Sequence, residues 1–237
     1  IAPLHAFHRR LPPLHARRPC MHPAPSDSGL LRLGAHLWRG DARAEVSVPS
    51  VGTGFEPLDA LLPGSGWPRA ALTELLVAQP GIGELSLLVP ALVRLCREPQ
   101  WIALAAPPHL PYAPALAAAG VDLARLLVMQ TSDGADTLWA MEQALASSAC
   151  SVVIGWPAFV NERALRRLQL ATEKGRAIGL YFSSGAATSN SLAALRLQLF
   201  AREDHRLGIR VLKVRGAGIG TTLALDVRHG TEGLSGP

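Results

Sequence analysis

Lysine is nearly absent from this chain of 237 residues, in which 23 Lys and Arg stand against 18 Asp and Glu. The only lysines are Lys174 and Lys213, so any motif that needs a lysine early in the chain is excluded. Charged residues make up only 17% of the sequence and hydrophobic residues 49%, which excludes a disordered chain and a coiled coil. No apolar run reaches about 18 residues, so we expect no membrane-spanning helix.

Cysteine is also scarce, since only Cys20, Cys96 and Cys150 are present. They are widely spaced and odd in number, which excludes a disulfide framework and a metal-ligand cluster. We therefore expect a cytoplasmic protein that needs neither a metal nor another cofactor.

The net charge of +5 is unevenly distributed along the chain. Residues 1–43 hold seven Arg against two Asp, and residues 44–150 hold four basic against ten acidic residues. Residues 151–237 hold twelve basic against six acidic residues, so the body of the chain is neutral overall but polarised. A uniformly basic coat for nucleic acid is therefore not indicated.

The chain divides into four expected parts. Residues 1–29 are rich in Pro, His and Arg and predict a disordered tail that lacks the apolar core of a secretory signal. Residues 30–49 predict a short helix and a linker, which either dock on the main domain or form an arm that docks on a neighbour. The core domain spans residues 50–229, and residues 230–237 form a flexible tail.

Apolar strands without polar alternation, each followed by a helical pattern, predict an α/β core with a mostly parallel sheet covered on both faces. Two further strands predict a terminal antiparallel hairpin. The expected strands are Ala71–Val77, Trp101–Ala105, Leu126–Met129, Ser151–Ile154, Ala177–Ser183, Gly208–Val214 and Thr221–Val227. The expected helices are Leu85–Arg97, Tyr112–Ala119, Ala135–Ser148, Glu162–Lys174 and Ser189–Phe200.

The loop after the first of these strands has the position of a phosphate-binding loop. Its spacing is close to G-x-x-x-x-G-K-[ST], and Gly81 and Gly83 are present, but Ala78 replaces the first glycine. Glu84 replaces the lysine and Leu85 the metal-binding hydroxyl. Two like charges about 4 Å apart repel by roughly 4 kcal/mol at an effective dielectric constant near 20. The sequence thus predicts a degenerate phosphate loop, in which Glu84 caps the next helix and occupies the anion site.

The segments Val51–Asp59 and Leu62–Arg69 resemble the entry to RecA-type cores, and the similarity extends over about residues 50–227. The resemblance implies a RecA-like three-layer core with a mostly parallel central sheet and a C-terminal antiparallel hairpin. Gly155 stands where that family has its Walker B aspartate, and Pro108 where it has its catalytic glutamate. The resemblance therefore implies a pseudo-ATPase, which is not an enzyme.

The Pro80–Leu85 loop and the Gly64–Pro68 turn resemble the ImuA family of RecA-like proteins. That resemblance implies a non-catalytic accessory protein of mutagenic translesion synthesis, induced by DNA damage in the SOS response. Its implied partners are an ImuB-like protein, an error-prone DNA polymerase, RecA and single-stranded DNA, with no membrane. Two alternatives stay open: a SulA-like SOS cell-division inhibitor, which shares the RecA-like shell, and an atypical P-loop ATPase.

Polar and basic side chains late in the chain are the candidates for contact with DNA or a partner. They are Arg163, Arg166, Arg167, Lys174, Arg176, Ser184, Thr188, Asn190, Arg210, Lys213 and Arg215. Because the body of the chain has no net charge, the sequence favours protein contact over strong intrinsic DNA affinity. Trp156, Pro157 and Phe159 follow a strand where an ATPase is polar, and they predict a packing or docking surface.

Overall fold

The computed structural model describes residues 49–184, 191–214 and 219–227. The predicted tails 1–29 and 230–237, and the predicted helix at residues 30–40, lie outside these residues.

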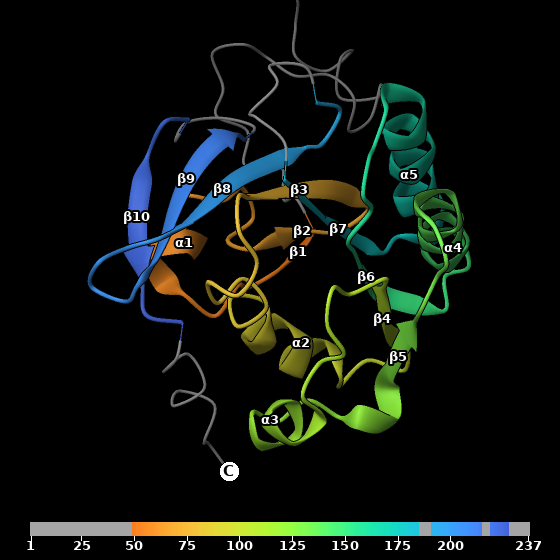
Figure 1. Cartoon of the computed structure of the whole chain (residues 1–237), viewed down its shortest axis with the longest axis horizontal. Coiled ribbons are helices and arrows are strands. Elements are labelled where there is room, and N and C mark those ends of the chain that lie inside the picture. The colour runs from red at the N-terminus through yellow and green to blue at the C-terminus, as the bar shows by residue number, and fades with distance from the viewer. Residues whose placement is uncertain (1–48, 185–190, 215–218, 228–237) are drawn as a thin grey trace, which may run out of the picture. The chain divides into compact units, whose positions relative to one another are not determined.

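Within the described residues, one mixed eight-stranded sheet organises the fold (Figure 1). Its strands are β3 (Ala71–Val77), β4 (Trp101–Ala105), β5 (Leu126–Met129), β6 (Cys150–Gly155), β7 (Ile178–Ser183), β8 (Leu195–Ala201), β9 (Leu207–Lys213) and β10 (Thr222–Leu225). They are arranged in the order β10-β9-β8-β3-β7-β6-β4-β5. Strands β3 to β8 pair in parallel, whereas β9 is antiparallel to both β8 and β10. A separate antiparallel pair joins β1 (Ser50–Val51) to β2 (Trp67–Pro68).

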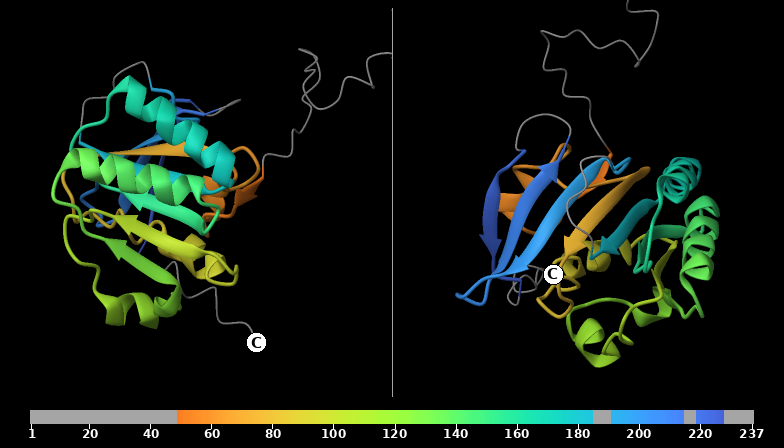
Figure 2. Two further views of the ribbon diagram at one scale, coloured as in Figure 1. Left: turned by 90° about the vertical axis from the view of Figure 1, so that its right-hand side faces the viewer. Right: turned by 45° about the horizontal axis from the view of Figure 1, so that its top comes forward.

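Helices cover both faces of this sheet. The helices are α1 (Glu56–Asp59), α2 (Val89–Leu95), α3 (Ala113–Ala118), α4 (Gly134–Ala146) and α5 (Glu162–Gly175), with one 3₁₀ turn, η2 (Leu123–Arg125). Helices α1, α2 and α3 bury apolar side chains in one core cluster, whereas α4 and α5 contribute to a second cluster on the opposite face. Figure 2 shows α4 and α5 lying together on their side of the sheet.

Helix α5 illustrates how local sequence sets these elements. The Asn161 side chain accepts a hydrogen bond from the Ala164 N–H at 2.8 Å, which caps the first turn. Leu165, Leu168 and Thr172 recur at helical spacing and are buried, so one face of α5 packs on the sheet. The helix ends at Arg176, which adopts the left-handed conformation with φ of 56°.

Most element positions that the sequence predicts are confirmed. Strands β3, β4 and β5 have the predicted bounds, and α4 and α5 agree with the predicted helices to within a few residues at their ends. Strands β9 and β10, which correspond to the predicted terminal hairpin, form an antiparallel pair. The assignment of the core as RecA-like stays a prediction. Across the described ranges, no helix combines the length and apolar character needed to cross a bilayer.

The predicted helix Ser189–Phe200 is wrong, because its described part contains strand β8. Leu195, Leu197 and Leu199 are buried on one face of the sheet and alternate with Arg196 and Gln198 on the other. This period of two is the signature of a strand. Strand β8 pairs with β3 on one side and β9 on the other, and these two ladders override the helix propensity of Ala, Leu and Arg.

The predicted helix Leu85–Arg97 is too long at its start. Residues 84–88 form turns, and α2 begins only at Val89. Pro90 lies in the first turn of α2, where its missing N–H leaves no helical hydrogen bond unmade. The proline that the sequence placed inside the helix therefore marks its beginning.

Candidate docking surface at the carboxyl edge of the sheet

The parallel strands all end at one edge of the sheet, so the loops that follow them gather there. We call this surface the carboxyl edge and define it as residues 78–88, 106–112, 156–161 and 183–184. Apart from Glu84, these segments contain no Asp, Glu, Lys or Arg. The part of this edge that the loops after β3, β4, β6 and β7 form is therefore almost uncharged.

The loop after β3 binds an anion that belongs to the chain itself. Glu84 is buried, and its carboxylate accepts the Gly81 N–H, with distances of 2.8 and 3.1 Å to the two oxygens. Gly81 and Gly83 have φ of 90° and 97°, a conformation that favours glycine. The loop thus directs a backbone amide at a carboxylate of the chain itself.

Glu84 does not cap the next helix as the sequence predicted. Helix α2 begins only at Val89, so the Glu84 carboxylate is bound within the loop and not at a helix N-terminus. Ala78 is exposed and Leu85 is half-buried, and neither side chain can bind phosphate or metal.

The two positions predicted to have lost acidic residues differ in their surroundings. Gly155 is buried at the end of β6, and a Cβ atom there would overlap the Met141 side chain of α4. An aspartate at this position would therefore require Met141 to move. Pro108 lies exposed in the loop after β4.

A depression of about 140 Å³ opens between the loops after β3, β6 and β7. The ring of Trp156 stacks on that of Phe182, with centroids 4.9 Å apart and planes inclined by 15°. The lining residues are Val77, Pro80, Glu84, Trp156, Pro157, Ala158, Phe182, Ser183 and Ser184. Aromatic and proline side chains thus cover the place where the resemblance put a nucleotide.

Three large apolar side chains stand out from the carboxyl edge. Phe159 is 74% exposed, Tyr112 72% and Leu110 70%. Tyr112 also borders a hollow of about 440 Å³ between α2 and α3. Exposed apolar groups that gather on one uncharged edge indicate a surface that binds another protein.

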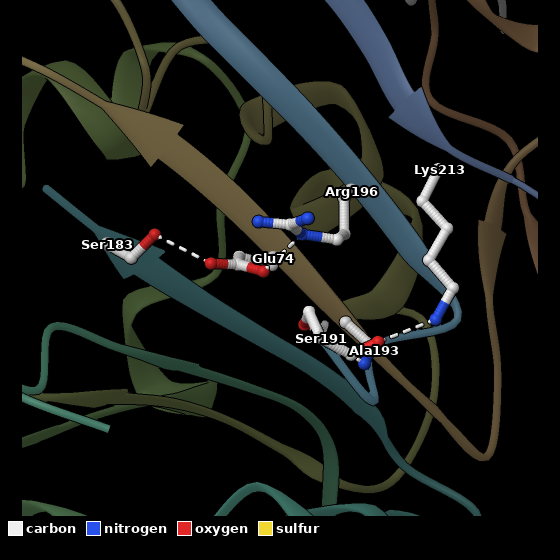
Figure 3. A network of polar contacts seen from close by, with 6 residues as sticks. All are labelled: Glu74, Ser183, Ser191, Ala193, Arg196 and Lys213. Atoms are coloured by element: carbon white, nitrogen blue, oxygen red, sulfur yellow. Dashed lines mark hydrogen bonds and ion pairs between the residues drawn. The ribbon is translucent and has the colours of Figure 1, made fainter. Parts of the chain in front are cut away.

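A buried polar network surrounds Glu74, in the middle of β3 (Figure 3). Glu74 on β3 accepts hydrogen bonds from Arg196 Nε at 2.6 Å and from Ser183 Oγ at 2.9 Å. Lys213 Nζ donates to the Ser191 carbonyl oxygen at 2.6 Å. The network therefore joins β3 and β7 to β8 and β9.

Tyr181 lies beside this network, and burial raises the pKa of its phenol well above the usual value. It therefore stays neutral in the folded protein at physiological pH. Glu74 and Arg196 are not among the site residues that the sequence predicts. Their signal was available, because each is a charged residue inside an otherwise apolar segment.

The structure brings only some of the predicted contact residues together. The side chains of Arg163, Arg166, Arg167 and Lys174 are exposed on the outer side of α5, and Arg176 follows directly. The others are dispersed. Ser184 lines the depression at the carboxyl edge, Arg210 is exposed on β9 and Lys213 belongs to the polar network, whereas Thr188, Asn190 and Arg215 lie outside the described residues.

Neither cysteine in the described segments has the surroundings of a reactive thiol, because burial raises the pKa of both Cys96 and Cys150. The same segments contain no group of three or more His, Cys, Asp or Glu placed to hold a metal ion.

Comparison with known proteins gives one family. Residues 72–179 match the family model described as cell division inhibitor SulA. This stretch contains most of the carboxyl edge and all of α5. It ends before β8, so β8, β9 and β10, which we call the terminal strands, lie outside the match.

Individual relatives agree with this match. Cell division inhibitor SulA of Edwardsiella piscicida is 36% identical over 97 residues, which are 40% of this chain and 58% of the relative. The protein of the same name from Photorhabdus laumondii is 32% identical over 93 residues, which are 39% and 52% of the two chains. The chain thus spans just over half the length of these curated relatives.

Among solved structures, SulA from Pseudomonas aeruginosa is 29% identical, with a TM-score of 0.41. The similarity covers 48% of this chain and 98% of that one.

These matches overturn the predicted role in translesion synthesis. The family and both relatives are named for the inhibition of cell division, so the predicted accessory function is wrong. The ImuB-like protein, the error-prone polymerase, RecA and single-stranded DNA are wrong as partners for the same reason. The SulA-like alternative is the one that the matches support.

Proposed function

We propose that this chain is a SulA-like inhibitor of cell division, which acts in the cytoplasm during the SOS response by binding a division protein. The observation that carries the proposal is the family match over residues 72–179, which contains the loops after β3, β4 and β6. The activity is inferred for the whole protein, because the chain spans just over half the length of the curated relatives.

The proposed partner is the tubulin-like division protein, and the proposed contact is the carboxyl edge. Protein interfaces combine a desolvated apolar centre with few charged groups, and aromatic side chains supply most of their binding energy. Phe159, Tyr112 and Leu110 are anchors of this kind. The lack of unpaired charge at the edge lowers the cost of removing water from it.

The mode of action needs no nucleotide. A phosphate near Gly81 would meet the buried Glu84 carboxylate, which already accepts the loop N–H and would repel it. We further propose that the core is RecA-like with a degenerate phosphate loop. Three features support this assignment: the parallel central strands, the antiparallel strands β9 and β10, and the left-handed glycines of the loop.

The proposal is tested by adding the purified chain to the purified tubulin-like division protein of the same organism and following its assembly by light scattering. Assembly should decrease, and cells that express the chain should form filaments. Replacing Phe159 and Tyr112 by Ser should weaken binding by about tenfold or more, because both anchors are lost.

Trp139→Ser is the matched control, since Trp139 is 61% exposed on α4 and lies outside the carboxyl edge. This variant should inhibit as the wild-type chain does. Normal assembly and normal division in the presence of the wild-type chain would overturn the proposed function.

A further inference from the structure

The outer side of α5 carries a row of exposed side chains, which we call the α5 face. Over the 11 positions from Arg163 to Lys174 an α-helix rises about 16 Å, long enough to span part of a protein interface. The members of the face are Arg163, Arg166, Arg167, Leu170, Lys174 and Arg176.

Most of the positive charge on the α5 face is not neutralised by the chain. Arg166 lies 3.6 Å from Glu162, with both side chains exposed, and Arg167 pairs with Glu142 on α4. In the part of the chain that the structure describes, Arg163, Lys174 and Arg176 have no acidic partner. Three cations thus remain at the two ends of one helix.

Five carboxylates of the described chain that are not fully exposed are engaged within the chain itself. Glu74 is paired with Arg196, Glu98 with Arg69 and Glu142 with Arg167. Glu84 is bound to the loop amide, and Asp59 accepts the Thr53 N–H. These five carboxylates offer little negative charge to a second copy of the chain, and the exposed Glu162 and Glu173 lie among the cations of the α5 face itself. This favours a different protein as the source of negative charge.

The centre of the face is apolar. Leu170 is 59% exposed and lies between the two cationic ends. The exposed Glu162 and Glu173 on the same helix would repel a phosphate backbone, and α5 holds no aromatic side chain on which a base could stack. An apolar centre flanked by cations suits an acidic protein surface better than a nucleic acid.

We propose that the α5 face is a second contact with the division protein, and that it binds an acidic surface of that partner. The inference rests on the proposed function. Helix α5 starts directly after residues 156–161, so the α5 face continues the carboxyl edge from Phe159 to Arg163. The partner must offer carboxylates toward both ends of the helix and an apolar group opposite Leu170. Complementary charge of this kind speeds association and fixes orientation.

The test measures binding of the full chain to the purified division protein at about 50 and about 300 mM NaCl. Arg163→Glu should weaken binding about tenfold at low salt and far less at high salt, because salt screens exposed charges. Leu170→Gln should weaken binding by a similar factor at both salt concentrations. Circular dichroism checks that these exposed substitutions leave the fold intact.

Arg97→Glu is the matched control, because Arg97 is exposed, has no acidic partner in the described chain and follows α2 on the opposite face of the sheet. It should leave binding unchanged. Equal loss in Arg97→Glu and Arg163→Glu would overturn the α5 face, as would normal low-salt binding by Arg163→Glu.

A wild-type chain that neither binds the division protein nor blocks division would instead refute the proposed function, and the inference with it. A labelled 30-nucleotide DNA strand serves as the second probe. If Arg163→Glu lowered DNA binding but left binding to the division protein unchanged, the α5 face would be a nucleic-acid surface and the inference would be wrong.

Discussion

Glu74 and Arg196 show how single residues hold the matched region to the terminal strands. Glu74 lies on β3, inside the part that matches the SulA family, whereas Arg196 lies on β8 beyond its end. Both side chains are buried, and they form an ion pair at 2.6 Å. A buried ion pair adds little net stability, because both charges lose their hydration. Removing one partner is costly, because the remaining charge stays buried without it. The pair therefore specifies how β8 lies against β3.

Replacing Glu74 by Ala should lower the free energy of unfolding by about 3–5 kcal/mol, because the Arg196 guanidinium then keeps its charge in a buried site. The double variant Glu74→Leu/Arg196→Met should recover most of this loss, since no charge remains to be buried. Urea unfolding of the three proteins measures both effects. A double variant no more stable than Glu74→Ala would show that the pair itself, and not the stranded charge, supplies the stability.

At the scale of elements, β8 is where composition and pairing disagree. Residues 191–200 contain Ala, Leu and Arg in proportions that suit a helix. The chain between β3 and β9 must nevertheless satisfy backbone groups on two sides, which only an extended strand can do. Leu195, Leu197 and Leu199 recur at every second position, and this hydrophobic pattern indicates a strand.

Gln198 provides a direct test of the strand, because it is half-buried on the face opposite these leucines. Gln198→Thr should be more stable than Gln198→Ala by about 0.5–1 kcal/mol, since threonine favours strands and alanine favours helices. Thermal unfolding should separate the two variants by about 1–4 °C. The reverse order of stabilities would contradict the assignment of β8 as a central strand.

At the scale of the whole described molecule, the core does not end where the family match ends. Leu197 of β8 and Leu207, Ile209 and Val211 of β9 belong to the same buried cluster as Leu75 of β3. Without the terminal strands, β3 would become an exposed sheet edge and lose its buried contacts on that side. The terminal strands are therefore part of the folding unit and not an appendage to it.

A chain that stops after Ser184 should consequently fail to unfold cooperatively and should aggregate, whereas the full chain should show a single urea transition. Circular dichroism and size-exclusion chromatography follow the two properties. The full chain with Leu212→Gln is a suitable control, because Leu212 is only half-buried on β9 and the terminal strands are kept. A truncated chain that remained monomeric with an unchanged transition would place the terminal strands outside the folding unit.

The sequence predicted the central elements well because their signals are local. The apolar run Ala71–Val77 and the capped, amphipathic segment Glu162–Lys174 need no distant partner to be recognised. The function that the sequence favoured was wrong, since a glutamate in place of a lysine in the loop Pro80–Leu85 argues against nucleotide binding without indicating which protein the chain binds. The presence of Glu84 in the loop can be read from the sequence. Its hydrogen bond with the Gly81 N–H can be seen only in the folded loop.

The amino-acid sequence alone identifies an α/β chain in which the strand Ala71–Val77 is followed by a loop with a glutamate where a phosphate loop has its lysine. Residue type and short-range spacing carry that information, and both can be read without knowing any tertiary contact. The folded chain is needed to see that Glu74 contacts Arg196, that β8 is a strand and that Phe159 and Tyr112 are exposed at the same edge of the sheet. These facts join residues far apart in the chain, and burial and pairing across that distance outweigh local preference.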